Sequence, residues 1–295
     1  MTDKKKTVKK KNDRIINLIL IGVMVLGVLI VAYPTISDWW NSYHSTRVIA
    51  SYTERVAAID TSEAEAMLAE AEAYNAALTE HEGRFALTDE ELKYYNSILD
   101  VTGTGIMGYV EIPKLHISLP IYHGSGESVL QTAIGHLEGT SFPVGGTGTH
   151  AALTGHRGLP SARLFTDIDQ LADGDYFAIH ILNRTVTYEV DQIHIVLPEE
   201  MEDLKIEPDK DYCTLITCTP YGINTHRLLV RGKRVDNDLE ILDVSADAQQ
   251  VQPGLTALGI AIPMLTLALI YILIMTSRKA SRKKAKQKQG REDTQ

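Results

Sequence analysis

The chain contains 295 residues, of which 44% are hydrophobic and 23% charged, and its formal net charge is −9. This balance excludes a disordered or collagen-like chain, and two cysteines are too few for a disulfide-rich scaffold or a four-cysteine zinc site. Residues 1–14 carry +5 and residues 276–295 carry +6, which leaves −20 between them and indicates separate compartments rather than a basic nucleic-acid-binding surface.

Two uncharged apolar runs, residues 15–32 and 255–275, lie just inside the basic ends. Each is long enough to cross a hydrocarbon core of about 30 Å as a helix, and neither shows the polar stripe of a buried core helix. The first run is also compatible with a cleaved signal peptide, although no small-x-small cleavage site follows it. Because each basic cluster lies on the outer flank of its run, we predict two transmembrane helices, cytoplasmic termini and an extracellular domain between them.

The segment after the first apolar run favours helices. Apolar residues recur at three- and four-residue spacing, first in Val48, Ile49, Tyr52 and Val56 and then in Met67, Ala71, Tyr74 and Leu78. Between the two sets, Ser62 and Glu65 form a capping-box pattern after Asp60 that predicts the start of the second helix. We expect a helical hairpin over residues 45–80 that packs on the following domain, with a partner-binding helix as the alternative.

Beyond Gly103, short runs rich in Val, Ile, Thr and Tyr alternate with Gly, Pro and Asp. We predict strands near residues 107–112, 116–122, 148–154, 176–182, 184–197, 212–218 and 226–234. The strongly alternating run 184–197 is expected to bend or to span two neighbouring strands. So many closely spaced strands indicate a closed barrel or a sandwich.

Residues 214–232 have the pattern expected of a reactive strand end. An apolar strand ends at Cys218, a Pro-Tyr-Gly turn follows, and a second strand returns through Arg227. If the strands pair, the guanidinium lies near the thiol, where it can stabilise a thiolate and a developing oxyanion. The alternative for Cys218 is a small buried hydrophobe. A disulfide with Cys213 is excluded, because five residues along one strand separate the two by roughly 16 Å.

A cysteine nucleophile needs a proton partner, which is usually a histidine. His156 lies at a strand end before a Gly-Leu-Pro turn and is the candidate that stands out. Strand alternation directs His226 to the face opposite Arg227. Three further histidines in glycine-rich loops stay open as alternatives: His123, His136 and His150.

These residues resemble a known family. TLITCTPYGINTHRLLVRG is similar to the active-site segment of the sortases, and LTGHRGLP is similar to their histidine segment. Four longer segments resemble the class C, pilin-polymerising sortases: GYVEIPKLHISLPIYHG, GHLEGTSFPVGG, LFTDIDQL and DYCTLITCTPYGINTHRLLVRGKR. The resemblance implies a mainly β fold built on an eight-stranded β-barrel. It also implies that Cys218 is the nucleophile, His156 the acid/base and Arg227 the stabiliser of the transition state.

The reaction implied by the resemblance is transpeptidation without a cofactor or metal. Cys218 cleaves an LPXTG-type sorting signal between Thr and Gly, and the acyl group passes to an amine, for pilus assembly a pilin lysine. The implied partners are pilin or surface proteins that carry such signals, and the membrane, but no nucleic acid. The alternatives are a cysteine peptidase that hydrolyses the same thioacyl intermediate, a cell-wall-anchoring sortase, and a noncatalytic membrane-tethered binding module.

The sequence departs from the class C pattern at the lid, which usually carries an Asp-Pro-aromatic motif. The corresponding stretch, residues 81–96, lacks this motif, so we expect a short, altered or absent lid, with Phe85 as the alternative plug. Asp38, Trp39 and Trp40 offer an acidic residue and aromatics as an alternative source of the motif, but they directly follow the first apolar run and are interpreted as interfacial anchors. The acidic segment 198–209 is expected to be a solvated loop that shapes the substrate groove, rather than a cation site.

The predicted protein is therefore a barrel with an N-terminal helical hairpin and flanking transmembrane helices in the cell membrane. Its predicted parts are a basic cytoplasmic tail (1–14), a transmembrane signal anchor (15–33), a helical region with the atypical lid (34–104), the barrel catalytic domain (105–237), a linker (238–253), a second transmembrane helix (254–275) and a second basic cytoplasmic tail (276–295).

Overall fold

The computed structural model describes residues 2–79, 81 and 83–237, with side chains from residue 19 onward. The predicted linker, second transmembrane helix and C-terminal basic tail lie outside the described residues, so those assignments stay predictions.

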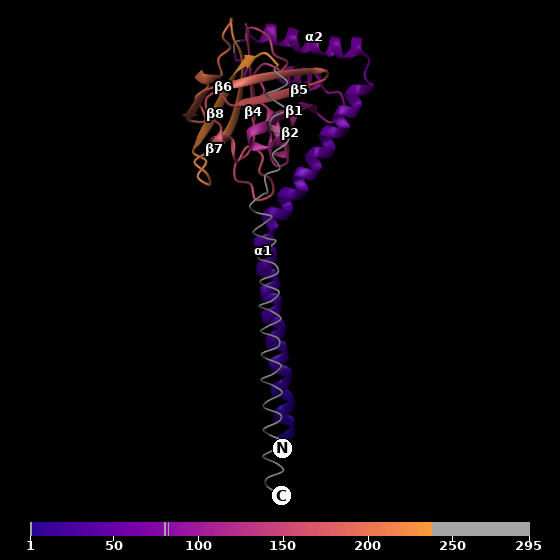
Figure 1. Ribbon diagram of the computed structural model, residues 1–295, viewed down its shortest axis with the longest axis vertical. Coiled ribbons are helices and arrows are strands. Elements are labelled where there is room, and N and C mark those ends of the chain that lie inside the picture. Colours follow the sequence, from indigo (N-terminus) through magenta and orange to yellow (C-terminus); the bar gives the residue numbers. More distant parts are fainter. Residues whose placement is uncertain (1, 80, 82, 238–295) are drawn as a thin grey trace. The chain divides into compact units, whose positions relative to one another are not determined.

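The first helix, α1 (Thr2–Ala58), is continuous from the basic tail through the first apolar run (Figure 1). The predicted boundary at residues 33 and 34 is therefore not a break in the helix, and Pro34 lies inside it. The stretch Ile19–Ala58 contains an 18-residue window with a mean hydropathy of 2.5, which makes it long and apolar enough to cross a membrane. Trp39 and Trp40 expose more than half of their surface, as interfacial anchors would.

The second helix, α2 (Thr61–Leu78), begins at Asp60, whose carboxylate accepts a 2.9 Å hydrogen bond from the backbone N–H of Ser62. The predicted capping box at Ser62 and Glu65 is therefore wrong: aspartate is an equally strong N-cap, and it lies two residues earlier. The break between the two helices lies where the sequence predicted it.

A capping box does occur further on, between Thr88 and Glu91, where it starts the unpredicted helix α3 (Asp89–Ser97). The shorter helical pieces are α4 (Glu127–Leu130) and three 3₁₀ turns, η1 (Pro113–Leu115), η2 (Ile168–Gln170) and η3 (Glu202–Leu204).

The predicted apolar faces of α1 and α2 cover the barrel. On α2 the buried residues are Ala64, Leu68, Ala71, Asn75 and Leu78. The Asn75 side-chain amide exchanges two hydrogen bonds with the backbone of Phe142, at 3.0 and 2.7 Å. On α1 the Tyr52 hydroxyl donates to Met107 O and accepts from Leu182 N, both at 2.8 Å. These bonds satisfy polar groups that burial would otherwise leave unpaired, so they fix both helices against the barrel.

Eight strands form a closed barrel in the order β1-β2-β3-β4-β7-β8-β6-β5 (Figure 1). They are β1 (Ile106–Ile112), β2 (Ile117–His123), β3 (Ile134–His136), β4 (Thr149–Thr154), β5 (Tyr176–Ile181), β6 (Arg184–Val196), β7 (Asp211–Thr219) and β8 (His226–Val235). The barrel implied by the resemblance and all seven predicted strands are confirmed, and β3 was missed. The 184–197 run forms the single strand β6, so the alternative prediction that it spans two neighbouring strands is wrong. Its irregularity is a register shift against β8 between Val190 and Gln192.

Candidate active site

The three predicted site residues come from three adjacent strand ends. β7 lies between β4 and β8, and its antiparallel pairing with β8 sets Cys218 directly opposite Arg227. The parallel pairing of β4 with β7 sets Thr154 beside Ile216. His156 and Cys218 each lie two residues beyond this Thr154–Ile216 pair, so they are expected to lie at the same height along the barrel. Because neighbouring strands lie about 4.8 Å apart, the three residues are grouped at one end of the barrel.

Side-chain alternation places Cys218 and Arg227 on one face of the sheet. Cys213 and Leu215 of β7 belong to the barrel core, so Cys218 points to the other, outer face. Ile216 points the same way and lies in a second apolar cluster outside the barrel. Residues directly opposite each other in a ladder share a face, which brings Arg227 to the side of Cys218.

The loop that carries His156 is bonded to β7 just before the histidine. Gly155 N donates to Ile216 O at 3.0 Å, and Thr217 Oγ1 donates to Gly155 O at 2.8 Å. The His156 side chain is 27% exposed, and its Nε2 lies 3.6 Å from Oε2 of Glu127, the first residue of α4. Among the described residues this nitrogen has no hydrogen-bond partner. This unpaired nitrogen is buried beside the Glu127 carboxylate, and an imidazole held in this way can exchange a proton with a substrate that contacts it.

The guanidinium of Arg227 is held by its own hairpin. Its Nη1 donates to Asn224 O at 3.4 Å and to His226 O at 3.2 Å. Within the described part of the chain, no carboxylate lies within ion-pairing distance of it. Arg231, on the same strand, is instead bonded to both carboxylate oxygens of Asp191. The charge of Arg227 is therefore free to attract an anion that forms beside Cys218.

Only one of the two cysteines is accessible. Both are free thiols, as the argument against a disulfide predicted, but Cys213 is fully buried while Cys218 is partly exposed. Burial raises the pKa of the Cys213 thiol well above its ordinary value, and the nearby Asp211 adds to this. Because the thiolate is the nucleophile, Cys213 is chemically inert in the folded protein.

The three alternative histidines are buried and hydrogen-bonded inside the protein. Burial lowers the pKa of His136 to about 3 and that of His150 to about 4, so both rings are neutral near pH 7. Both ring nitrogens of His123 lie within 3 Å of backbone carbonyl oxygens. His226 pairs with Thr219, one position along from the Cys218 pair and therefore on the opposite face.

The segment in the position of the lid, residues 81–96, packs on the outer surface of the barrel domain. Arg84 donates from Nη1 to Gly139 O at 3.1 Å and from Nη2 to Leu204 O at 2.8 Å. Phe85 lies against this guanidinium, 4.5 Å from Cζ to ring centroid, and is 40% exposed. Arg84 therefore attaches the start of this segment to the loops around Gly139 and Leu204, while Tyr95 near its end is buried in the barrel core.

We expect Phe85→Ala to leave the rate of Cys218 alkylation unchanged, because Cys218 is already partly exposed and Phe85 contacts Arg84 instead. The measurement is iodoacetamide labelling followed by mass spectrometry. Cys213→Ala serves as the background, so that only one thiol is present. Very slow labelling that Phe85→Ala accelerates several-fold would show that Phe85 covers the thiol after all.

The acidic loop, residues 198–209, packs on the sheet beside the candidate site. Leu204 of η3 is buried against Ile216 of β7 and Leu229 of β8, on the same outer face as Cys218. Within the described residues, no group of three or more His, Cys, Asp or Glu side chains could hold a metal ion. The predicted role of residues 198–209 in shaping a groove stays a hypothesis, and this packing gives it a physical basis.

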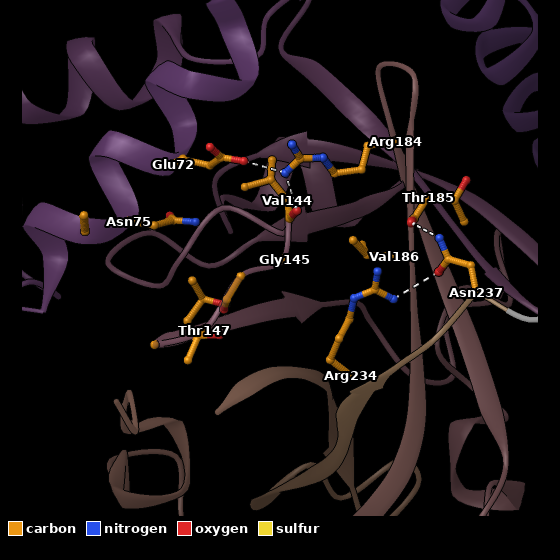
Figure 2. A pocket seen from close by; sticks show the side chains of 14 residues that line it. Glu72, Asn75, Val144, Gly145, Thr147, Arg184, Thr185, Val186, Arg234 and Asn237 are labelled. Atoms are coloured by element: carbon orange, nitrogen blue, oxygen red, sulfur yellow. Dashed lines mark hydrogen bonds and ion pairs between the residues drawn. The ribbon is translucent and has the colours of Figure 1, made fainter. Parts of the chain in front are cut away.

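A pocket of about 440 Å³ opens at the other end of β7, between α2, a glycine-rich loop and the ends of β6 and β8 (Figure 2). Figure 2 shows Arg184 bonded to Glu72 and Arg234 bonded to Asn237. Asp211, at the pocket end of β7, is separated from Cys218 by roughly 23 Å of strand. The pocket is therefore separate from the candidate active site.

Residues 110–235 match the family model described as Sortase domain. The chain is 28% identical over 131 residues to sortase D of Bacillus subtilis (strain 168), an alignment that covers 43% of this chain and 63% of that protein. It is 30% identical over 131 residues to sortase A of Streptococcus agalactiae serotype III (strain NEM316), covering 43% of this chain and 52% of that protein. The chain thus spans between half and two thirds of the length of these curated relatives.

The solved structures match over a longer region. Sortase C1 of Streptococcus agalactiae is 53% identical with a TM-score of 0.64, and the match covers 65% of this chain and 100% of that one. Sortase C of Clostridium perfringens, solved with the C-terminal cell wall sorting motif, is 44% identical with a TM-score of 0.58 and covers 65% and 99%.

Proposed function

Because the chain belongs to the sortase family, with class C sortases among its structural relatives, we propose that it is a cysteine transpeptidase. We propose that it cleaves an LPXTG-type sorting signal between Thr and Gly and joins the acyl group to an amine. The observation that supports the proposal is the strand register, which sets Cys218 opposite Arg227 on the outer face of the sheet. The same register pairs Thr154 with Ile216, each two residues before His156 and Cys218 respectively.

In the first half-reaction, the Cys218 thiolate attacks the carbonyl carbon of the Thr residue. A C–S bond forms, and the carbonyl oxygen becomes an oxyanion that the Arg227 guanidinium stabilises. When the oxyanion collapses, the C–N bond breaks and His156 gives its proton to the departing Gly amine. The product of this step is a thioacyl enzyme, which divides one difficult amide exchange into two easier acyl transfers.

In the second half-reaction, an amine attacks the thioester carbon and His156 takes the proton that it loses. The C–S bond then breaks and Cys218 leaves as the thiolate. Both halves pass through an oxyanion at the same position, so Arg227 acts twice. Because Arg227 is bonded only to carbonyl oxygens of its own hairpin among the described residues, its charge is available in both steps.

For the acceptor and the location, the proposal follows the class C relatives. We propose a pilin lysine as the amine, pilins or surface proteins with sorting signals as partners, and a role in pilus assembly. We propose that α1 anchors the protein in the membrane, with the barrel outside the cell and both termini in the cytoplasm. The apolar stretch and the exposed tryptophans of α1 support the anchor.

The proposal is tested by incubating the soluble domain with an LPXTG-type peptide and an amine-bearing acceptor peptide and following the products by mass spectrometry. We expect a ligated product in which the acyl fragment ending in Thr is joined to the acceptor amine. The free acid alone would instead identify a cysteine peptidase that passes the acyl group to water. No turnover of several such signals would contradict an enzymatic role and favour a binding module.

The acceptor also separates the two remaining sortase roles. A pilin-polymerising enzyme is expected to use a lysine side chain of a pilin domain. A cell-wall-anchoring enzyme is expected to prefer the amine of a peptidoglycan cross-bridge peptide. Competition between these two acceptors in one reaction distinguishes them, and preference for the cell-wall amine would overturn the proposed role in pilus assembly.

A further inference from the structure

Arg157, which follows His156 directly, connects the histidine loop to the residues that follow Cys218. Its Nη1 donates to the Thr219 hydroxyl at 3.3 Å, and its guanidinium lies 5.9 Å from the ring centroid of Tyr221. Its Nη2 is bonded to the carboxylate of Asp169. The Arg157 side chain is only 11% exposed, so it is not an ordinary solvated surface charge.

The neighbouring glycine fits the same contact. Gly158 has a φ of +76°, and a Cβ at this position would lie 2.8 Å from the ring of Tyr221. The Tyr221 ring, in the turn after Cys218, therefore occupies space that a side chain at position 158 would need. Tyr221 itself is 61% exposed, so the bond from Arg157 to Thr219 is the contact that holds this turn against the histidine loop.

Bonds between these two segments lie on both sides of the candidate pair. Before it, Gly155 is bonded to the backbone of Ile216 and to the hydroxyl of Thr217. After it, Arg157 is bonded to Thr219. His156 and Cys218 are the residues between these two attachments. With both attachments in place, neither residue can move far from the other.

We propose that Arg157 is a positioning residue, which fixes the distance between the His156 imidazole and the Cys218 thiol by tying their two loops together. The inference rests on the proposed function, because it assigns Arg157 to the proton-transfer geometry of that reaction. Asp169 supports this contact, because its carboxylate is bonded to the guanidinium that reaches Thr219 and Tyr221. The bond to Asp169 also leaves Arg157 without a free charge for substrate, unlike Arg227.

We expect Arg157→Ala to lower kcat about 10- to 100-fold while KM changes little, because a loss of alignment of about 1 Å has effects of this size. Arg157→Lys is expected to be intermediate, since one ammonium cannot hold both partners in the planar geometry of the guanidinium. Asp169→Asn should shift kcat in the same direction by a smaller factor. Iodoacetamide alkylation of Cys218, which involves no proton transfer to a leaving amine, is expected to be unchanged in all three.

Arg163→Ala is the matched control. Arg163 lies in the same loop and pairs with Asp167, but its side chain is 57% exposed and, among the residues that the structure describes, makes no hydrogen bond to the Cys218 turn. We expect wild-type kcat in this variant. If Arg157→Ala keeps wild-type kcat, or if Arg163→Ala loses as much, the positioning role is overturned.

Two further outcomes separate this inference from the proposed function. A wild-type protein that ligates peptides, together with an Arg157→Ala variant of unchanged kcat, overturns the positioning role alone. A wild-type protein that forms no thioacyl intermediate overturns the proposed function and the inference with it. A kcat loss in Arg157→Ala that Asp169→Asn does not share in any degree would also count against the positioning role, because the carboxylate orients the guanidinium.

Discussion

Replacing Cys218 with alanine is expected to abolish the thioacyl intermediate and ligation, whereas replacing Cys213 is expected to leave both nearly intact. Removing a nucleophile from a set of residues that act as a unit costs on the order of 10⁴-fold or more in kcat. Cys213 is fully buried and burial raises its pKa, so it cannot take over the reaction. Its loss creates a small cavity that costs about 1 kcal/mol of stability.

The measurement is the mass of the protein after incubation with an LPXTG-type peptide, which reports the acyl adduct directly. Urea unfolding of both variants shows whether the fold is retained. Retained ligation in Cys218→Ala would contradict the nucleophile assignment. An inactive but folded Cys213→Ala would show that the core behind β7 controls the chemistry, which the burial of Cys213 gives no reason to expect.

The hairpin that joins Cys218 to Arg227 was predictable because both residues lie within one local pattern. An apolar strand, a turn with Pro and Gly, and a returning strand fix the pairing when the connection is short. Alternation then settles which face each side chain occupies, and it correctly separated His226 from Arg227. Short-range order of this kind is available to sequence reasoning without any knowledge of the fold.

The proximity of His156 to Cys218 is a different case. It depends on the parallel pairing of β4 with β7, two strands that are far apart in the chain. The sequence pattern showed only that His156 follows a strand, and nothing local determines which strand end it meets. The family resemblance implied that His156 and Cys218 act together, and the register of β4 against β7 supports that proposal. The bond from Arg157 to Thr219 depends on the same long-range pairing, so composition and spacing gave no signal for it.

The local errors have local causes. β3 has three residues, too few to show an alternating pattern. Asp60 and Ser62 are both good N-caps, and the structure uses the first. α1 continues through Pro34, so the proline does not end the helix there, and the predicted boundary between the membrane span and the helical region stays a prediction. None of these errors moves a residue of the candidate site.

Replacing Arg227 with alanine is expected to lower kcat about 10²- to 10³-fold, the usual cost of removing one donor from an oxyanion site. Arg227 is opposite Cys218, and its described bonds are to the carbonyl oxygens of Asn224 and His226. Its role is therefore to meet charge that develops in the transition state rather than to support the fold. Arg227→Lys keeps the charge but not the planar fork, so it is expected to recover only part of the rate.

Arg231 is the matched comparison, because it separates a loss of catalysis from a loss of stability. It lies on the same strand and pairs with Thr214, as Arg227 pairs with Cys218, so both arginines are on the outer face. Arg231 is bonded to Asp191 and lies 4.1 Å from the ring centroid of Tyr212. Arg231→Ala should therefore lower the free energy of unfolding by about 1–3 kcal/mol while kcat per folded molecule stays unchanged.

We therefore expect the two variants to give opposite results in two measurements, single-turnover acylation and urea unfolding. Arg227→Ala should lose acylation rate and keep its stability, because its carbonyl acceptors can bond to water once the side chain is gone. Arg231→Ala should lose stability and keep its rate, because Asp191 is left partly buried without its partner. Equal acylation rates in the two variants would remove Arg227 from the oxyanion site and leave its position opposite Cys218 without a chemical role.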